Sequence, residues 1–98
     1  MITAILLCSV DRQRIPETAQ QLVDIPEVSE VYSVAGDYDL VAIVRVRHHD
    51  DLAEVVTEKL AKLEAITQTN TLIAFKTFST HDLERLFSIG SEEVGGSR

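Results

Sequence analysis

The two halves of this chain resemble each other at a constant spacing of 38 residues, and this repeat limits the folds available to it. The aligned positions are Ala4-Ile5-Leu6 with Ala42-Ile43-Val44, Leu22 with Leu60, Ile25 with Leu63, Val28 with Ile66 and Val34 with Leu72. Each half has the pattern of a strand, a helix and a strand. Two such units predict an α+β, ferredoxin-like βαββαβ sandwich, in which right-handed crossovers place both helices on one face of a four-stranded antiparallel sheet.

Local patterns supply the individual elements. Apolar, β-branched runs predict strands at 2–10, 28–35, 39–48 and 66–78. The first helix is expected to begin near Pro16, to end before Pro26, and to bury Ile15, Ala19, Leu22 and Val23. The second is expected within 48–66, capped by Asp50 or Asp51 and burying Leu52, Val55, Val56, Leu60 and Leu63. A short helix follows within 79–90, so residues 1–89 are predicted to form one domain and 90–98 a disordered tail.

Helices on one face leave the other face of the sheet bare. Alternation along the third strand places Ala42, Val44 and Val46 under the helices. The bare face then carries Val41 and Ile43, and the repeat places Ile5 and Leu7 beside them. A face this apolar favours contact with a second copy, so we expect a homodimer packed sheet against sheet.

Charge and composition exclude several classes of protein. The formal net charge is -7, and the nine basic residues are scattered, which argues against direct binding of nucleic acid. The single cysteine, Cys8, excludes an internal disulfide and is expected to pack as a small core residue. No apolar run is long enough to span a bilayer, so a cytoplasmic location is expected.

No pattern of catalytic or metal-binding residues is evident. His48 and His49 are adjacent in a strand end, so their side chains point in opposite directions and suit one metal ion poorly. A nucleophile with a partnering base is not recognisable. We therefore expect no catalytic residues, no metal and no cofactor, and predict that the protein is not an enzyme.

The turn in the segment VAGDYDLVAIVRV, residues 34–46, is the strongest candidate for a binding site. Gly36, Asp37, Tyr38 and Asp39 stand between two apolar strands, and Asp39 opens a strand, where aspartate is disfavoured. Asp39 is suited to an ammonium group and the turn amides near Gly36 to a carboxylate. Thr67, Thr69 and Thr71 alternate along the fourth strand and are expected to form a row of hydroxyls on one face. These groups fit a small zwitterion such as a free amino acid.

These residues resemble a known family. The stretches VYSVAGDYDLVAIVRV and TQTNTLIAF are similar to the effector-binding (RAM) domain of the Lrp/AsnC transcriptional regulators, over residues 2–79. The resemblance implies dimers that pack through their sheets, further assembly into ring-like oligomers, and amino-acid effectors bound between dimers. It assigns the G-x-Y-D turn, Gly36, Tyr38 and Asp39, to that cleft, with Asp37 at the variable position. Thr67 and Thr71 are assigned to it less directly.

Family regulators carry an N-terminal helix-turn-helix, whereas this sequence starts at the first strand. We therefore expect a stand-alone amino-acid sensor that acts by ligand-linked assembly or by association with full-length Lrp/AsnC regulators. Two alternatives stay open. One is an oligomeric adaptor without a ligand, and the other is a dimeric ferredoxin-like oxygenase or isomerase.

Overall fold

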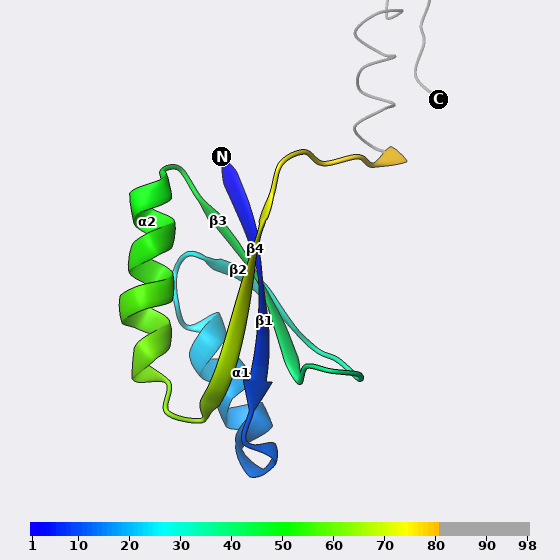
Figure 1. The fold of residues 1–98 in the computed structure, drawn as a ribbon, viewed down its shortest axis with the longest axis vertical. Helices are drawn as coiled ribbons and strands as arrows, with labels where there is room; N and C mark the ends of the chain where they lie inside the picture. Colours follow the sequence, from blue (N-terminus) through cyan, green and yellow to red (C-terminus); the bar gives the residue numbers. More distant parts are fainter. Residues whose placement is uncertain (81–98) are drawn as a thin grey trace, which may run out of the picture.

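The computed structural model describes residues 1–80 and has the predicted element order. The elements are β1 (Ile2–Val10), α1 (Ile15–Val23), β2 (Val28–Ser33), β3 (Leu40–Val46), α2 (His49–Glu54) and β4 (Ile66–Ala74). A 3-10 turn, Arg12–Arg14, precedes α1. A π turn, Val55–Lys59, and a 3-10 turn, Leu60–Lys62, continue α2. The two helices form one layer and the four strands form the other (Figure 1).

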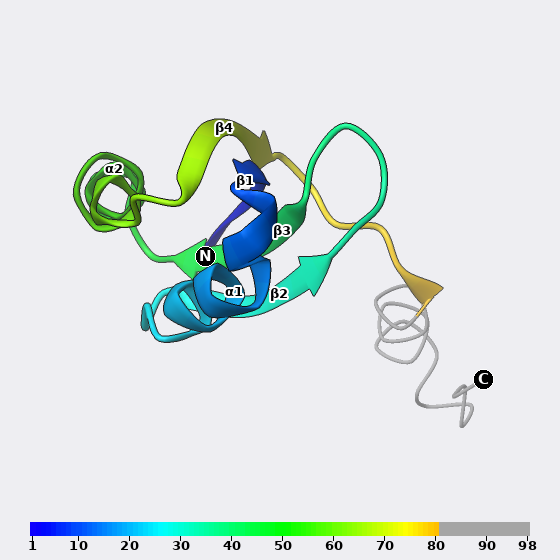
Figure 2. The ribbon, with the colours of Figure 1, turned by 90° about the horizontal axis from the view of Figure 1, so that it is seen from below.

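The four strands form one antiparallel sheet in the order β2-β3-β1-β4. The two central strands, β1 and β3, begin 38 residues apart at Ile2 and Leu40, and the edge strands β2 and β4 begin at Val28 and Ile66, the same spacing. Both helices pack on one face of the sheet (Figure 2). The ferredoxin-like fold expected from the repeat is therefore confirmed.

The core lies between this face and the helices. Its fully buried sheet residues are Ala4, Leu6, Cys8, Leu40, Ala42 and Val44, and from the helices Leu22, Leu52, Val55 and Leu60 pack against them. Burial raises the pKa of the Cys8 thiol to about 11, so this side chain acts as a small apolar residue and not as a nucleophile.

Within residues 1–80 no helix covers the opposite face of the sheet, which we call the open face. It carries Ile5 and Leu7 from β1, with their cross-strand partners Ile43 and Val41 from β3. On β4, Leu72 pairs with Ile5 and is 47% exposed. The predicted division between the two faces of β3 is confirmed, because Ala42, Val44 and Val46 are buried.

Several local predictions need correction. In α1, Val23 is 50% exposed and Ile15 and Ala19 are only partly buried. Its buried residues are Leu22 and Thr18, which lies four residues before Leu22 and so on the same side of the helix. The second helix begins at His49 and no side chain caps it, so Asp50 and Asp51 lie in its first turn instead. Strands β2, β3 and β4 are shorter than expected. The helix expected within 79–90 and the tail at 90–98 lie outside the described residues, apart from Ser79 and Thr80.

Thr18 is an unusual core residue because its hydroxyl has no hydrogen-bond partner among residues 1–80, although the residue is fully buried. Burying an unpaired hydroxyl costs about 1–3 kcal/mol. We predict that Thr18→Val, which keeps the shape and removes the hydroxyl, raises the free energy of unfolding by about 1 kcal/mol in a urea titration. Thr18→Ser, which keeps the hydroxyl and loses a methyl group, should lower it by a similar amount. A loss of stability in Thr18→Val would mean that a bound water satisfies the hydroxyl.

Candidate functional site

The turn between β2 and β3 is closed by a backbone hydrogen bond from Val34 N to Asp39 O at 3.0 Å. Gly36 lies inside this turn with a φ of +123°. An added Cβ at Gly36 would meet no atom within 4 Å, so lack of space does not require glycine here. The positive φ does, because residues with a side chain rarely adopt it. Gly36 and Asp37 are both exposed, which leaves the turn accessible from solvent.

Asp39 fixes the turn to the end of β1. Its backbone N–H donates to Cys8 O at 2.9 Å, and its carboxylate Oδ2 accepts the backbone N–H of Val10 at 2.8 Å. The side chain thus replaces a backbone acceptor where the β1–β3 ladder ends. This explains an aspartate at the start of an apolar strand. Oδ1 receives no hydrogen bond from residues 1–80, so half of the carboxylate is available to a ligand.

Tyr38 extends from the same turn toward the opposite edge of the sheet. Its phenolic oxygen accepts a hydrogen bond from Asn70 Nδ2 on β4 at 3.3 Å. Asn70 pairs with Leu7, whose side chain is on the open face, so Tyr38 lies over the end of β1 on that face. The phenol is half-buried. Tyr38, Asp39 and Asn70 together form what we call the corner.

A bulge in β4 breaks the predicted row of threonines, because Thr69 and Thr71 share one face whereas Thr67 does not. Val10 pairs with Ile66 and Ser9 with Gln68, which leaves Thr67 as the extra residue. Its hydroxyl donates to Ser9 O at 3.2 Å. Thr69 and Thr71 pair with Cys8 and Leu6 and therefore lie on the helix side of the sheet.

Within one chain the predicted site residues are thus only partly brought together. Gly36, Asp37, Tyr38 and Asp39 share the turn, whereas Thr71 lies on the other face of the sheet and Thr67 is part of the bulge. The sequence prediction omitted Asn70. Asparagine is disfavoured in strands, but Asn70 stands within the polar run TQTNT, so the sequence gives little to distinguish it from its neighbours.

A second polar group borders the open face on β2 and β3. Tyr32 Oη donates to Glu30 Oε2 at 2.6 Å, and this hydrogen bond raises the pKa of Tyr32. Arg45 Nη1 lies 3.9 Å from Glu30 Oε1. These exposed side chains leave the apolar centre of the face flanked by charge on one side.

Residues 1–80 contain neither a cluster suited to a metal ion nor a helix suited to a membrane. In that segment, no three His, Cys, Asp or Glu side chains gather in a way that would hold a metal ion. Nor does any helix of this segment have the length and apolarity needed to cross a membrane. His48 and His49 lie at the start of α2 and are both exposed.

Comparison with known proteins gives a consistent result. Residues 3–83 match the Lrp/AsnC ligand binding domain. The HTH-type transcriptional regulator FL11 of Pyrococcus furiosus is 33% identical over 75 residues, which cover 76% of this chain and 49% of FL11. An uncharacterized HTH-type regulator of the same organism, PF0250, is 38% identical over 61 residues, covering 62% of this chain and 41% of that protein. The chain thus spans about half the length, or less, of these curated relatives.

Solved structures agree with this result. The structure of TTHA0845 from Thermus thermophilus superimposes with a TM-score of 0.76 at 40% identity, covering 81% of this chain and 99% of that one. FFRP-DM1 gives a TM-score of 0.73 at 37% identity, covering 76% and 100%. E. coli AsnC has the same fold, with a TM-score of 0.75 at 24% identity over 81% of this chain and 54% of its own.

An antiparallel sheet of order β2-β3-β1-β4 with two helices on one face defines a small α+β domain of the ferredoxin-like class. The chain belongs to the Lrp/AsnC ligand-binding domain family. Its named relatives are HTH-type transcriptional regulators. The family expected from the GDYD turn is confirmed.

The hydrogen bond from Val10 N gives Asp39 a structural role that can be measured. Asp39→Ala leaves this partly buried donor without an acceptor, and we predict a loss of about 1–3 kcal/mol in the free energy of unfolding. Asp39→Asn keeps an oxygen at the same place and should cost less than half as much. Urea titrations of the two variants make the comparison. Equal stability of Asp39→Ala and the unmodified chain would show that the hydrogen bond contributes nothing.

Proposed function

We propose that this domain senses a free amino acid and acts as an oligomer whose assembly the ligand controls. The geometry of the corner is the main support for this proposal. It holds a carboxylate oriented by a backbone N–H, a phenol oriented by an amide, and an exposed turn, all at the border of an apolar surface.

The proposed oligomer begins with two copies packed through their open faces. Ile5, Leu7, Val41, Ile43 and Leu72 make this surface too apolar to remain in water. At about 25 cal/mol per Å2 of apolar area, burying five such side chains from each copy contributes roughly several kcal/mol before the cost of association. Further packing of dimers into rings would place the exposed turns at the contacts between neighbours.

The corner matches the two charged groups of an amino acid. The free Oδ1 of Asp39 accepts from an ammonium group, while its other oxygen stays bonded to Val10 N. The turn amides around Gly36 can donate to a carboxylate. Thr67 and Thr71 point elsewhere in the same chain, so they can take part only from another copy. One solved relative in fold, NMB0573 from Neisseria meningitidis, is described as a complex with L-Met.

Control of assembly follows from linkage. A ligand that binds between copies has a higher affinity for the assembled state, and it shifts the equilibrium by no more than that difference in affinity. A domain of this kind can respond alone or join oligomers with full-length regulators that carry the DNA-binding part. The relatives named as HTH-type regulators support the second arrangement.

The amino-acid site can be tested with a variant that leaves the fold in place. We predict that Asp39→Asn, which retains the acceptor for Val10 N and loses the charge, weakens amino-acid binding roughly 10- to 100-fold in titration calorimetry across the twenty amino acids. Asp37→Asn removes an equal charge from the exposed neighbour and should change affinity less than threefold. Absence of binding for all twenty amino acids, or equal losses in the two variants, would contradict the proposed site.

The sheet-to-sheet contact has its own test. Ile5 lies at the centre of the open face between Ile43 and Leu72, so Ile5→Glu would bury a charge at the contact. We predict a monomer for this variant by light scattering at micromolar concentration, against a dimer or larger assembly for the unmodified chain. Val23→Glu adds the same charge to an exposed position on α1 and should leave the mass unchanged. Loss of assembly in both variants, or in neither, would contradict the contact.

A further inference from the structure

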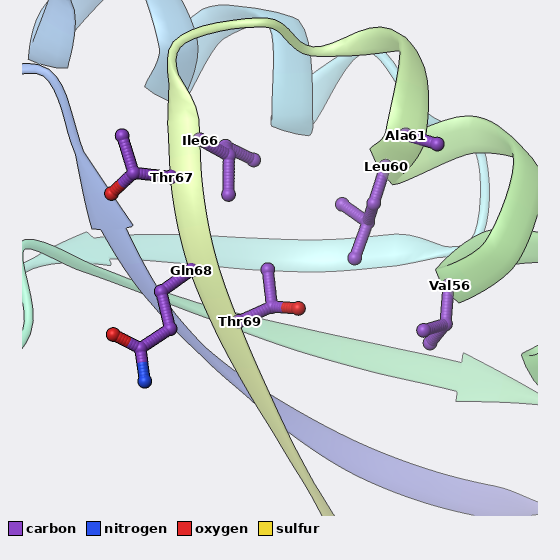
Figure 3. Close-up of a pocket in the computed structure, with 7 residues that line it drawn as sticks. All are labelled: Val56, Leu60, Ala61, Ile66, Thr67, Gln68 and Thr69. Atoms are coloured by element: carbon purple, nitrogen blue, oxygen red, sulfur yellow. The ribbon is translucent and has the colours of Figure 1, made fainter.

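A hollow of about 270 Å3 lies between the C-terminal half of the second helix and the first half of β4. Figure 3 shows it from the side of β4. Its lining residues are Val56, Leu60, Ala61, Ile66, Thr67, Gln68 and Thr69. The three larger apolar side chains, Val56, Leu60 and Ile66, are partly or fully buried, whereas Ala61 and Thr69 are exposed at the mouth. The corner described above lies on the other face of the sheet, so the hollow is a separate place.

The hollow exists because two irregularities face each other. On the strand, the bulge at Thr67 reverses the alternation, so Ile66 and Thr69 point to the same side although three positions separate them (Figure 3). On the helix, the backbone changes from an α to a π turn at Val55–Lys59 and then to a 3-10 turn at Leu60–Lys62. π turns and β-bulges are both found frequently at functional sites.

Side-chain contacts hold the irregular helix in place. Thr57 Oγ1 donates to the carbonyl of Ala53 at 2.7 Å, just before the wide turn, which satisfies a carbonyl there. Lys59 Nζ lies 2.7 and 2.9 Å from the two carboxylate oxygens of Glu27. The Thr57 hydrogen bond lies within the helix, and the partly exposed Lys59–Glu27 ion pair links the helix to the residue before β2.

The lining determines what the hollow can bind. None of its seven residues carries a charge, and Val56, Leu60 and Ile66 supply an apolar wall. The Thr69 hydroxyl has no partner within residues 1–80 and points toward the helix (Figure 3). A cavity of roughly 150 Å3 accommodates benzene, so this larger, partly open hollow can hold a small apolar group with one polar end.

We propose that the hollow between the π turn of the second helix and the bulge of β4 binds an uncharged amphiphile of about six to ten non-hydrogen atoms, with its apolar part against Val56, Leu60 and Ile66 and its polar end at Thr69. This site is independent of the amino-acid corner. A domain with both would respond to two chemically different small molecules.

The test uses 4-methylpentan-1-ol as the probe and amide chemical shifts of the 15N-labelled chain as the measurement. We expect saturable shifts at Val56, Leu60, Ala61 and Thr69 with a Kd on the order of 1 mM, and little change at Gly36 and Tyr38. The carboxylate 4-methylpentanoate should bind at least tenfold more weakly, because its charge finds no partner in the lining. Equal binding of the two probes would overturn the uncharged class. Absent or scattered shifts would overturn the site.

Variants complete the test. Ala61→Phe fills the mouth and should abolish the shifts, whereas Ala53→Phe, an exposed alanine earlier in the same helix, should leave the Kd within twofold. Thr69→Val keeps the shape, removes the hydroxyl and should weaken binding roughly two- to tenfold. If Ala61→Phe does not fold, Thr69→Val and the residue map of the shifts decide the outcome. Asp39→Asn should leave binding of the alcohol unchanged, which separates this site from the corner.

Discussion

The antiparallel sheet has both helices on one face, and the other features of the molecule depend on this asymmetry. The covered face supplies the whole core, since Ala4, Leu6, Cys8, Ala42 and Val44 all point toward α1 and α2. The open face carries side chains that are nearly as apolar, and the described part of the chain places no layer above them. A domain of this size has a thin core and a small free energy of unfolding. The unfavourable free energy of leaving this apolar area in water is therefore large by comparison. Contact with another copy is the simplest way to remove that area from water.

Asp39 illustrates how one residue serves both fold and site. A carboxylate at the start of a strand is unfavourable by propensity, yet here it completes the hydrogen bonding of β1 at Val10. The same bond orients the carboxylate and leaves one oxygen toward solvent. Tyr38 is held in a similar way by Asn70, from the far strand of the sheet. A site whose side chains are oriented by hydrogen bonds from β1 and β4 loses little freedom when a ligand binds, which favours affinity.

The bulge in β4 has a larger effect than a single inserted residue suggests. It changes the side to which Ile66 points, because Ile66 is the β4 residue that precedes it and is shifted by one position relative to β1. Ile66 and Thr69 then share a side with Leu60, and the hollow beside α2 results. A regular strand would have aligned Thr67, Thr69 and Thr71 and left no such space. Irregular backbone thus determines where polar groups gather on this edge of the sheet.

The sequence by itself determined the element order, the fold, the division of β3 into two faces and the family. These features follow from the hydrophobic period, the turn residues and the internal repeat. Each of these patterns can be recognised from residues that are close in the sequence or a constant spacing apart. Only the tertiary structure decided that Asn70 joins Tyr38, that Asp39 accepts from Val10, that Thr18 and not Val23 is buried, and that the threonines of β4 are divided. These facts depend on strand register and on a bulge, and register is set by contacts between residues far apart in the chain, which periodicity does not encode.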